Sequence, residues 1–115
     1  MSFKLVAVQD FDRELKRLSK KYQSLKYDYL SLVESLEEAP LQGTALGKDC
    51  YKIRMPIRSK GKGKSGGARI ITYVKIIDEI VYLLSIFDKS EQDSISEKEI
   101  IARLNSINKL QWTSY

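Results

Sequence analysis

The stretch that decides the fold runs from Tyr51 to Phe87 and reads YKIRMPIRSKGKGKSGGARIITYVKIIDEIVYLLSIF. Its first part, Tyr51–Ile57, alternates apolar and charged side chains, which is typical of a half-buried β-strand with a cationic outer face. The runs Ala68–Ile76 and Ile80–Phe87 are rich in β-branched and aromatic residues, as central strands are. A flexible, Gly/Lys-rich loop, Ser59–Gly67, is expected between the first strand and the second. The stretch therefore predicts three consecutive strands of a largely antiparallel sheet.

Two helices are predicted before this stretch and one after it. A short apolar run, Phe3–Val8, is expected to form a first strand. Asp10 then suits the N-cap of a helix whose apolar residues repeat at helical spacing as far as Tyr22. A second helical stretch covers about Leu25–Glu38, and Ser96–Leu110 begins with the capping-box sequence Ser-Glu-Lys-Glu. The predicted order is β-α-α-β-β-β-α, an α+β fold with two N-terminal helices and a C-terminal helix, in a single domain spanning residues 1–115.

Positive charge is concentrated in the middle of the chain. The segment Lys52–Arg69 holds seven basic residues and no acidic one, whereas the whole chain of 115 residues has a net charge of +5. The segment thus contributes +7, and the rest of the chain sums to −2. A concentrated cationic patch attracts a polyanion by field focusing and counterion release. Nucleic acid, and RNA in particular, is the partner that this pattern predicts.

Composition excludes several other kinds of protein. The length and a hydrophobic content of 43% suggest one globular domain with a modest core. The apolar runs are too short for a membrane span or a secretory signal, so we expect no membrane association. The single cysteine, Cys50, fits a reducing cytoplasm, and the absence of histidine removes a Cys–His nucleophile pair and the commonest zinc sites. We therefore expect neither a metal ion nor a cofactor.

The run Gly63-Lys64-Ser65 is similar to the end of a phosphate-binding P-loop, but the rest of that motif is missing. The P-loop needs glycine five residues before Gly63, where this chain has Arg58. It also needs a helix after Ser65, where this chain has a predicted strand. The sequence therefore excludes a nucleotide-binding P-loop.

Two interpretations remain for the loop Ser59–Gly67. It can be a solvated turn whose lysines only maintain solubility. It can also bind phosphates, with glycines that let the backbone approach them and lysines that neutralise their charge. The second interpretation is favoured because the cationic residues continue onto the adjacent strand, as an electrostatic footprint requires. The candidate phosphate-binding residues are Lys52 and Arg54 on the strand and Arg58, Lys60, Lys62 and Lys64 beyond it.

Arg69 starts the strand after this loop, so rigid backbone is expected to hold its guanidinium group. A fixed planar fork suits the oxygens of a phosphoryl transition state better than a flexible lysine does. The alternative role is an ion pair with an acidic residue of a neighbouring strand, and the residues leave this open. The acidic candidates are Asp78, Glu79 and Asp88.

Three runs of residues together resemble the RelE/ParE superfamily of toxins, most closely its RelE-like and HigB-like members. They are Lys52–Arg54, Ser59–Val74 (SKGKGKSGGARIITYV) and Leu83–Glu91 (LLSIFDKSE). The first and last predicted helices agree as well, so the resemblance covers nearly the whole chain. It implies a compact sheet with two N-terminal helices, and the toxin role in a type II toxin–antitoxin pair. RelE-like members cut mRNA in the ribosomal A site without a metal, by attack of a 2′-OH on the adjacent phosphate.

The resemblance also implies roles for single residues. Arg69 matches the family's strand arginine, which is expected to stabilise the transition state. Arg54 and Lys52 match the cationic strand before the loop and are expected to bind the phosphate, which places Arg54 in the catalytic set. Lys89 lies where the family has a catalytic group, although some relatives have His-Tyr or Tyr there, so its role as acid or base stays open. Further candidates are Tyr73 and Glu91.

The partners that the resemblance implies are a cognate antitoxin, the ribosome and mRNA. Two other functions remain open. A ParE-like protein would have the same fold and would arrest growth by binding DNA gyrase, without nuclease activity. A non-catalytic RNA-binding module would bind RNA without cutting it.

Overall fold

The structure is a computed structural model that describes residues 2–113 and, within the last helix, the side chains as far as Ile107. A first strand, β1 (Lys4–Ala7), is followed by two helices, α1 (Gln9–Lys21) and α2 (Leu25–Glu38). Four strands come next: β2 (Thr44–Gly47), β3 (Cys50–Met55), β4 (Ala68–Lys75) and β5 (Ile80–Asp88). Single turns of 3-10 helix, η1 (Arg58–Lys60) and η2 (Ile76–Asp78), lie in the two loops between the last three strands, and α3 (Glu97–Thr113) follows β5.

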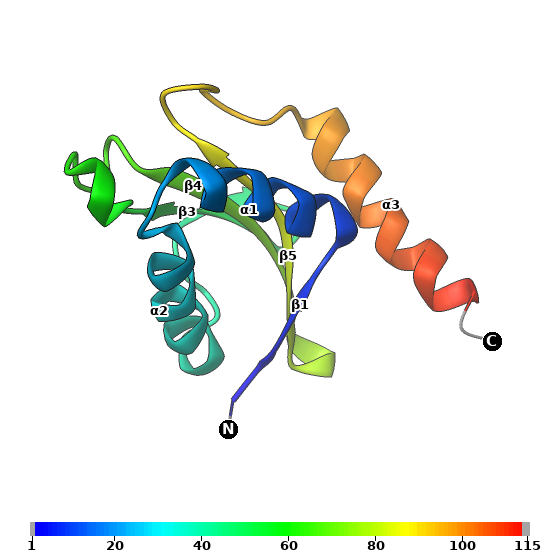
Figure 1. Cartoon of the computed structure of the whole chain (residues 1–115). Helices are drawn as coiled ribbons and strands as arrows, with labels where there is room; N and C mark the ends of the chain where they lie inside the picture. The colour runs from blue at the N-terminus through cyan, green and yellow to red at the C-terminus, as the bar shows by residue number, and fades with distance from the viewer. Residues whose placement is uncertain (1, 114–115) are drawn as a thin grey trace.

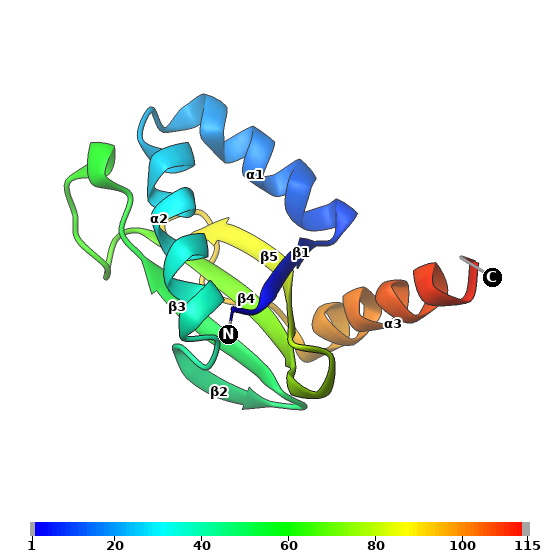
Figure 2. The ribbon, with the colours of Figure 1, turned by 90° about the horizontal axis from the view of Figure 1, so that it is seen from below.

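The strands form one five-stranded sheet in the order β1-β5-β4-β3-β2. β1 runs parallel to β5, and every other neighbouring pair is antiparallel. The helices α1 and α2 pack over one face of the sheet, and α3 runs apart from them against β5 (Figures 1 and 2). The α+β fold with helices on a largely antiparallel sheet, expected from the sequence, is confirmed. None of the described helices is long and apolar enough to cross a membrane.

The core lies between the two N-terminal helices and the middle of the sheet. Phe11 and Leu18 of α1 and Leu25 and Leu36 of α2 are fully buried, as the helical spacing of apolar residues predicts. Every residue from 81 to 88 of β5 is buried as well. Burial of one such large side chain contributes about 1.5–3 kcal/mol, so this packing fixes the position of the central strands.

The start of α1 differs from the sequence prediction. The N-cap is Val8 and not Asp10. The Val8 N–H donates to Leu83 O (3.1 Å), which keeps the chain extended to this residue, and Val8 O accepts the first helical bond from the Asp12 N–H (3.1 Å). Asp10 falls in the first turn, where its carboxylate still favours the positive end of the helix dipole.

The strand β2 is an element that the sequence pattern does not predict. Lys48 and Asp49 form the two-residue turn of the β2–β3 hairpin, with φ of 55° and 62°. This left-handed geometry matches the type I′ turn that two-residue hairpins favour, but the turn lacks the usual glycine. All residues of β2 are exposed, so no alternation of apolar and polar residues marks the strand.

Candidate active site

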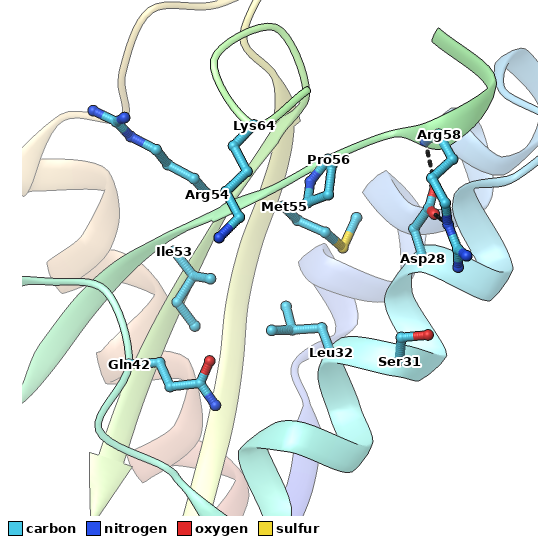
Figure 3. Close-up of a pocket in the computed structure, with 10 residues that line it drawn as sticks. All are labelled: Asp28, Ser31, Leu32, Gln42, Ile53, Arg54, Met55, Pro56, Arg58 and Lys64. Atoms are coloured by element: carbon cyan, nitrogen blue, oxygen red, sulfur yellow. Dashed lines mark hydrogen bonds and ion pairs between the residues drawn. The ribbon is translucent and has the colours of Figure 1, made fainter. Parts of the chain in front are cut away.

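The side chains of β3 divide between the two faces of the sheet. Ile53 and Met55 line a pocket of about 450 Å³ together with Leu32 of α2. Because side chains alternate along a strand, Lys52 and Arg54 leave β3 on the opposite face, although Arg54 and Lys64 are also among the residues that line this pocket. In Figure 3 the guanidinium of Arg54 points away from Leu32 and Ile53. The predicted half-buried strand with a cationic outer face is therefore confirmed.

Two arginines lie opposite each other on the face away from α2. Arg54 of β3 pairs in register with Arg69 of β4. Lys52 lies two residues before Arg54, on the same face of β3, and pairs with Ile71. We call Lys52, Arg54 and Arg69 the cationic face. Directly opposed residues have Cβ atoms about 4.5–5.5 Å apart, and like charges in such a pair destabilise a sheet. An anion bound between the two guanidinium groups would remove this repulsion.

Arg69 is only 5% exposed, and its hydrogen bonds go to main-chain oxygens. Nη1 donates to Lys64 O (2.9 Å) and Ala68 O (3.2 Å), and Nη2 donates to Ser65 O (3.2 Å). Within the part of the chain that the structure describes, no carboxylate pairs with it, so the alternative ion pair is not seen. Burial and the charge of Arg54 lower the pKa of Arg69 below its ordinary value. An arginine stays protonated even so, and this one is a positive charge without a counter-ion in the described chain.

The loop between β3 and β4 is held at its start by two carboxylates. Asp28 of α2 accepts hydrogen bonds from Arg58 Nε (2.8 Å) and from the Arg58 N–H (3.1 Å), as Figure 3 shows. Asp88, at the end of β5, accepts one from Lys60 Nζ (2.7 Å). The expectation of a flexible loop is therefore wrong for this part, because two buried acidic side chains fix its first basic residues. These two predicted phosphate-binding residues are already engaged within the protein.

Asp88 is a functional candidate that sequence reasoning missed. Its side chain is fully buried and accepts hydrogen bonds from Lys60, from the Tyr22 hydroxyl, and from the Ser90 N–H (2.9 Å) and hydroxyl (2.8 Å). Burial by itself raises the pKa of this carboxyl, but these hydrogen bonds outweigh it and hold the pKa well below its usual value. The sequence indicates only a turn at this place, since its partners come from segments far away in the chain.

The remainder of the loop is exposed and carries two lysines, Lys62 and Lys64. Neither forms an ion pair with any residue that the structure describes. The loop rejoins the sheet at Gly67, where a Cβ atom would lie 2.2 Å from Met55 O. Only glycine permits this close approach, so the chain can turn back beside β3 and place Arg69 opposite Arg54.

Lys89 lies directly after β5 and is tied to the same loop. Its N–H donates to Gly67 O (3.1 Å), and its Nζ pairs with Asp93 (2.6 Å). The side chain is 35% exposed. The structure thus brings Lys89 to the end of the sheet where the loop closes.

Glu91 and Tyr73, the two further candidates, have partners of their own. Glu91 accepts hydrogen bonds from Lys21 Nζ (2.8 Å) and Arg17 Nη2 (3.1 Å), and these cations lower its pKa. Tyr73 stacks on Tyr82 with ring centroids 5.8 Å apart. Tyr73 is four residues from Arg69, or roughly 13 Å along the strand, so packing accounts for its position.

No group of three or more acidic or cysteine side chains that could hold a metal ion occurs among the described residues. What the site offers instead is positive charge in three positions: the cationic face, the two lysines of the loop, and Lys89 beside them. Such a set can bind phosphates and stabilise negative charge that develops on them.

The family model that describes the RelE toxin of the RelE/RelB toxin–antitoxin system matches residues 9–113. The chain belongs to the RelE toxin family. The resemblance stated from the sequence is thereby confirmed. Among curated proteins, none matches the sequence of this RelE-family toxin.

Solved structures of RelE toxins share the fold. The isolated E. coli RelE toxin is 27% identical with a TM-score of 0.54, covering 90% of this chain and 99% of that one. A mutant of E. coli RelE in complex with a peptide of antitoxin RelBc is 22% identical with a TM-score of 0.53, covering 90% and 95%. The RelBE2 toxin–antitoxin complex of Mycobacterium tuberculosis is 13% identical with a TM-score of 0.57, covering 76% and 99%.

Proposed function

We propose that this RelE-family toxin is a ribosome-dependent endoribonuclease that inhibits translation by cutting mRNA in the A site. The observation that supports the proposal most strongly is the pair formed by Arg54 and Arg69. Arg69 is buried and Arg54 exposed, the two residues pair in register on neighbouring strands, and neither has a carboxylate partner in the described chain. This is a prepared site for a phosphate that gains negative charge during a reaction.

The proposed reaction is an internal transfer within the RNA. The 2′ oxygen of a nucleotide attacks the adjacent phosphorus, the O2′–P bond forms, and the bond from phosphorus to the 5′ oxygen of the next nucleotide breaks. A base takes the proton of the 2′-OH, and an acid gives a proton to the leaving 5′ oxygen. The products are a 2′,3′-cyclic phosphate and a 5′-OH. Arg69 and Arg54 would neutralise the equatorial oxygens of the pentacoordinate phosphorus, so the proposal requires no metal ion.

Lys89 is the candidate for proton transfer, because it is the one ionisable side chain of the predicted catalytic set that lies outside the arginine pair. It stands at the end of β5, tied by its N–H to Gly67, two residues before Arg69. Glu91 is held in its ionised form by Lys21 and Arg17. It therefore suits a role as acceptor better than a role as general acid.

The remaining cations would hold the RNA on either side of the reacting phosphate. Lys52 extends the cationic face along β3, and Lys62 and Lys64 project from the exposed part of the loop. Arg58 and Lys60 would act mainly by fixing the loop, because both are engaged by buried carboxylates. Neutralised phosphates release counterions, so binding should weaken steeply as salt is added.

We propose that a cognate antitoxin covers this surface with acidic and apolar residues. The structures of E. coli RelE with an antitoxin peptide and of the RelBE2 complex support such a partner. Co-expression of the toxin with the adjacent small open reading frame should restore growth. Growth arrest that persists at equal expression would argue against that pairing.

The experiment that tests the nuclease proposal is primer extension on an mRNA held in purified ribosomes. We expect cuts at A-site codons that are absent without ribosomes and leave a 2′,3′-cyclic phosphate. Intact mRNA, with a toxin that is folded and still binds its antitoxin, would contradict the proposal. Inhibition of DNA supercoiling in its place would support the ParE-like function.

A further inference from the structure

We infer that Asp88 is a positioning residue of the proposed cleavage centre. Its buried carboxylate holds, through Lys60, the loop that carries Lys62 and Lys64, and it holds the turn that carries Lys89. The inference rests on the proposed function, because positioning matters only if these lysines act on RNA. The sequence offers Asp88 only as a possible ion-pair partner of Arg69, whereas in the structure it pairs with Lys60.

The link to the loop runs through Lys60. Its Nζ donates to Asp88 Oδ1 (2.7 Å) and to Ser90 Oγ (3.0 Å), and it lies 5.4 Å from the centre of the Tyr22 ring. The Lys60 side chain is only 12% exposed, so its amine is directed into the protein and not toward an RNA on the surface. Lys62 and Lys64 follow two and four residues later, and a displaced Lys60 would carry them with it.

The link to the turn runs through both the side chain and the main chain of Asp88. Asp88 Oδ1 accepts from the Ser90 N–H and hydroxyl, and Asp88 O accepts from the N–H groups of Glu91 and Gln92 (3.0 Å each). These bonds shape the turn in which Lys89 lies. Asp88 also pairs in register with Ala68 at the start of β4, next to Arg69.

The link to α1 completes the arrangement. The other oxygen, Asp88 Oδ2, accepts from the Tyr22 hydroxyl, and Lys21 Nζ lies 3.9 Å from it. One carboxylate therefore joins the end of α1, the start of the loop and the turn after β5. A buried carboxylate is stable only with such a set of donors, so removing its charge should loosen all three at once.

Position matters here because transition-state stabilisation depends on geometry. A displacement of about 1 Å in a group that orients the reactants can lower a rate by roughly 100-fold. A buried ion pair with only a structural role would give a different result. Its loss would lower the stability of the fold and leave the rate of the folded molecules unchanged.

The test compares Asp88→Asn with the control Asp78→Asn, which removes an exposed carboxylate paired with Lys75 at the opposite end of β5. Two quantities are measured well below the unfolding temperature: amide hydrogen exchange at Lys60, Gly61 and Gly67, whose N–H groups form the hydrogen bonds of the loop, and the single-turnover rate of mRNA cleavage at saturating ribosomes. We expect faster exchange in the loop and a rate roughly 10- to 100-fold lower for Asp88→Asn, with neither change in the control.

If Asp88→Asn does not fold, a less disruptive variant can test the same inference. Tyr22→Phe removes one hydrogen bond to the same carboxylate and should show the same two changes, smaller in size. Lys60→Met should reproduce the effects of Asp88→Asn, and the double variant Asp88→Asn/Lys60→Met should cost much less than the product of the two single effects.

Three outcomes would overturn the inference. Loop exchange that stays unchanged in Asp88→Asn would show that the carboxylate does not hold the loop, whether or not the protein cuts RNA. An unchanged cleavage rate would show that the held position is irrelevant to the reaction. Tighter RNA binding by Asp88→Asn would show that Asp88 only restrains a lysine that binds RNA directly. If the wild-type protein cuts no RNA, the proposed function fails. The exchange measurement still decides whether the Asp88 carboxylate holds the loop in place.

Discussion

Arg69 illustrates what a single residue reveals in sequence and in structure. Its place at the start of a strand, after a Gly-rich loop, predicts a guanidinium group held by rigid backbone. Its hydrogen bonds to Lys64 O and Ser65 O are not predictable, because they depend on how the loop folds back over the strand. The same contacts make Arg69 part of the loop's support, so its replacement would disturb structure and chemistry together. Arg54 is exposed and lacks such contacts, which makes it the cleaner residue to change.

Thr72 gives a prediction at the same scale. Its side chain is fully buried in β4, and its hydroxyl has no hydrogen-bond partner among the described residues. Thr72→Val replaces the hydroxyl with a methyl group of similar size, so we expect the free energy of unfolding to rise by about 1 kcal/mol. Urea unfolding measures the change. The control Thr44→Val, in the exposed strand β2, should change it by no more than about 0.5 kcal/mol, and a destabilised Thr72→Val would contradict the prediction.

At the scale of elements, a side chain of α3 and one of α1 form hydrogen bonds with the exposed edge of β5. The pairing of β1 with β5 ends at Ala7 and Leu83, which leaves the rest of β5 without a strand on that side. There Arg103 Nη1 donates to Leu84 O (2.7 Å), and Glu14 accepts from the Ile86 N–H (3.2 Å). The two side chains also pair with each other, so an ion pair takes the place of the missing strand. Helical spacing predicts α3 but not this contact.

Loss of this ion pair should therefore destabilise the fold. Arg103→Met leaves Leu84 O without this donor and removes the cation from the Glu14 carboxylate, which keeps only the Ser85 hydroxyl and the Ile86 N–H as donors. We expect a loss of roughly 3 kcal/mol in the free energy of unfolding, at the low end for a buried pair because the Glu14 side chain is 25% exposed. Urea unfolding is again the measurement. Lys98→Met, on the exposed side of α3, should be close to neutral, and equal effects of the two changes would argue against a role for the pair.

At the scale of the whole molecule, the sequence predicts the fold class, seven of the eight helices and strands to within a few residues at each end, and the concentration of charge. It does not predict β2, whose turn lacks the usual glycine, and it places the start of the first helix two residues late. It does not predict that buried carboxylates pair with Arg58 and Lys60, and the assignment of these two residues to RNA stays a prediction. Periodicity reports which face of an element is buried, but only the fold reveals which distant acidic residue lies beside a given cation.

The carboxylates of the site predict how stability depends on pH. Ion pairs and hydrogen bonds hold the pKa values of Asp88 and Glu91 below their ordinary values. The stabilisation is therefore complete above the unfolded-state pKa of about 4 and is lost as the pH falls through the lower folded-state values. Urea unfolding between pH 7 and pH 3 should show a plateau and then a decline. Asp88→Asn should start lower and decline less, and a stability that rises on acidification would contradict these assignments.

The central claim is that Arg54 and Arg69 form a phosphate site and not a structural pair. The measurement that tests it most directly is the single-turnover rate of ribosomal mRNA cleavage by Arg54→Ala, taken together with its free energy of unfolding and with Lys98→Ala as control. We predict that the cleavage rate falls while the free energy of unfolding does not. The rate should fall by roughly 100-fold because one stabilising cation is lost, while stability should stay the same or rise by about 0.2–1 kcal/mol because Arg69 no longer faces a like charge. A cleavage rate equal to that of the wild type would contradict the claim.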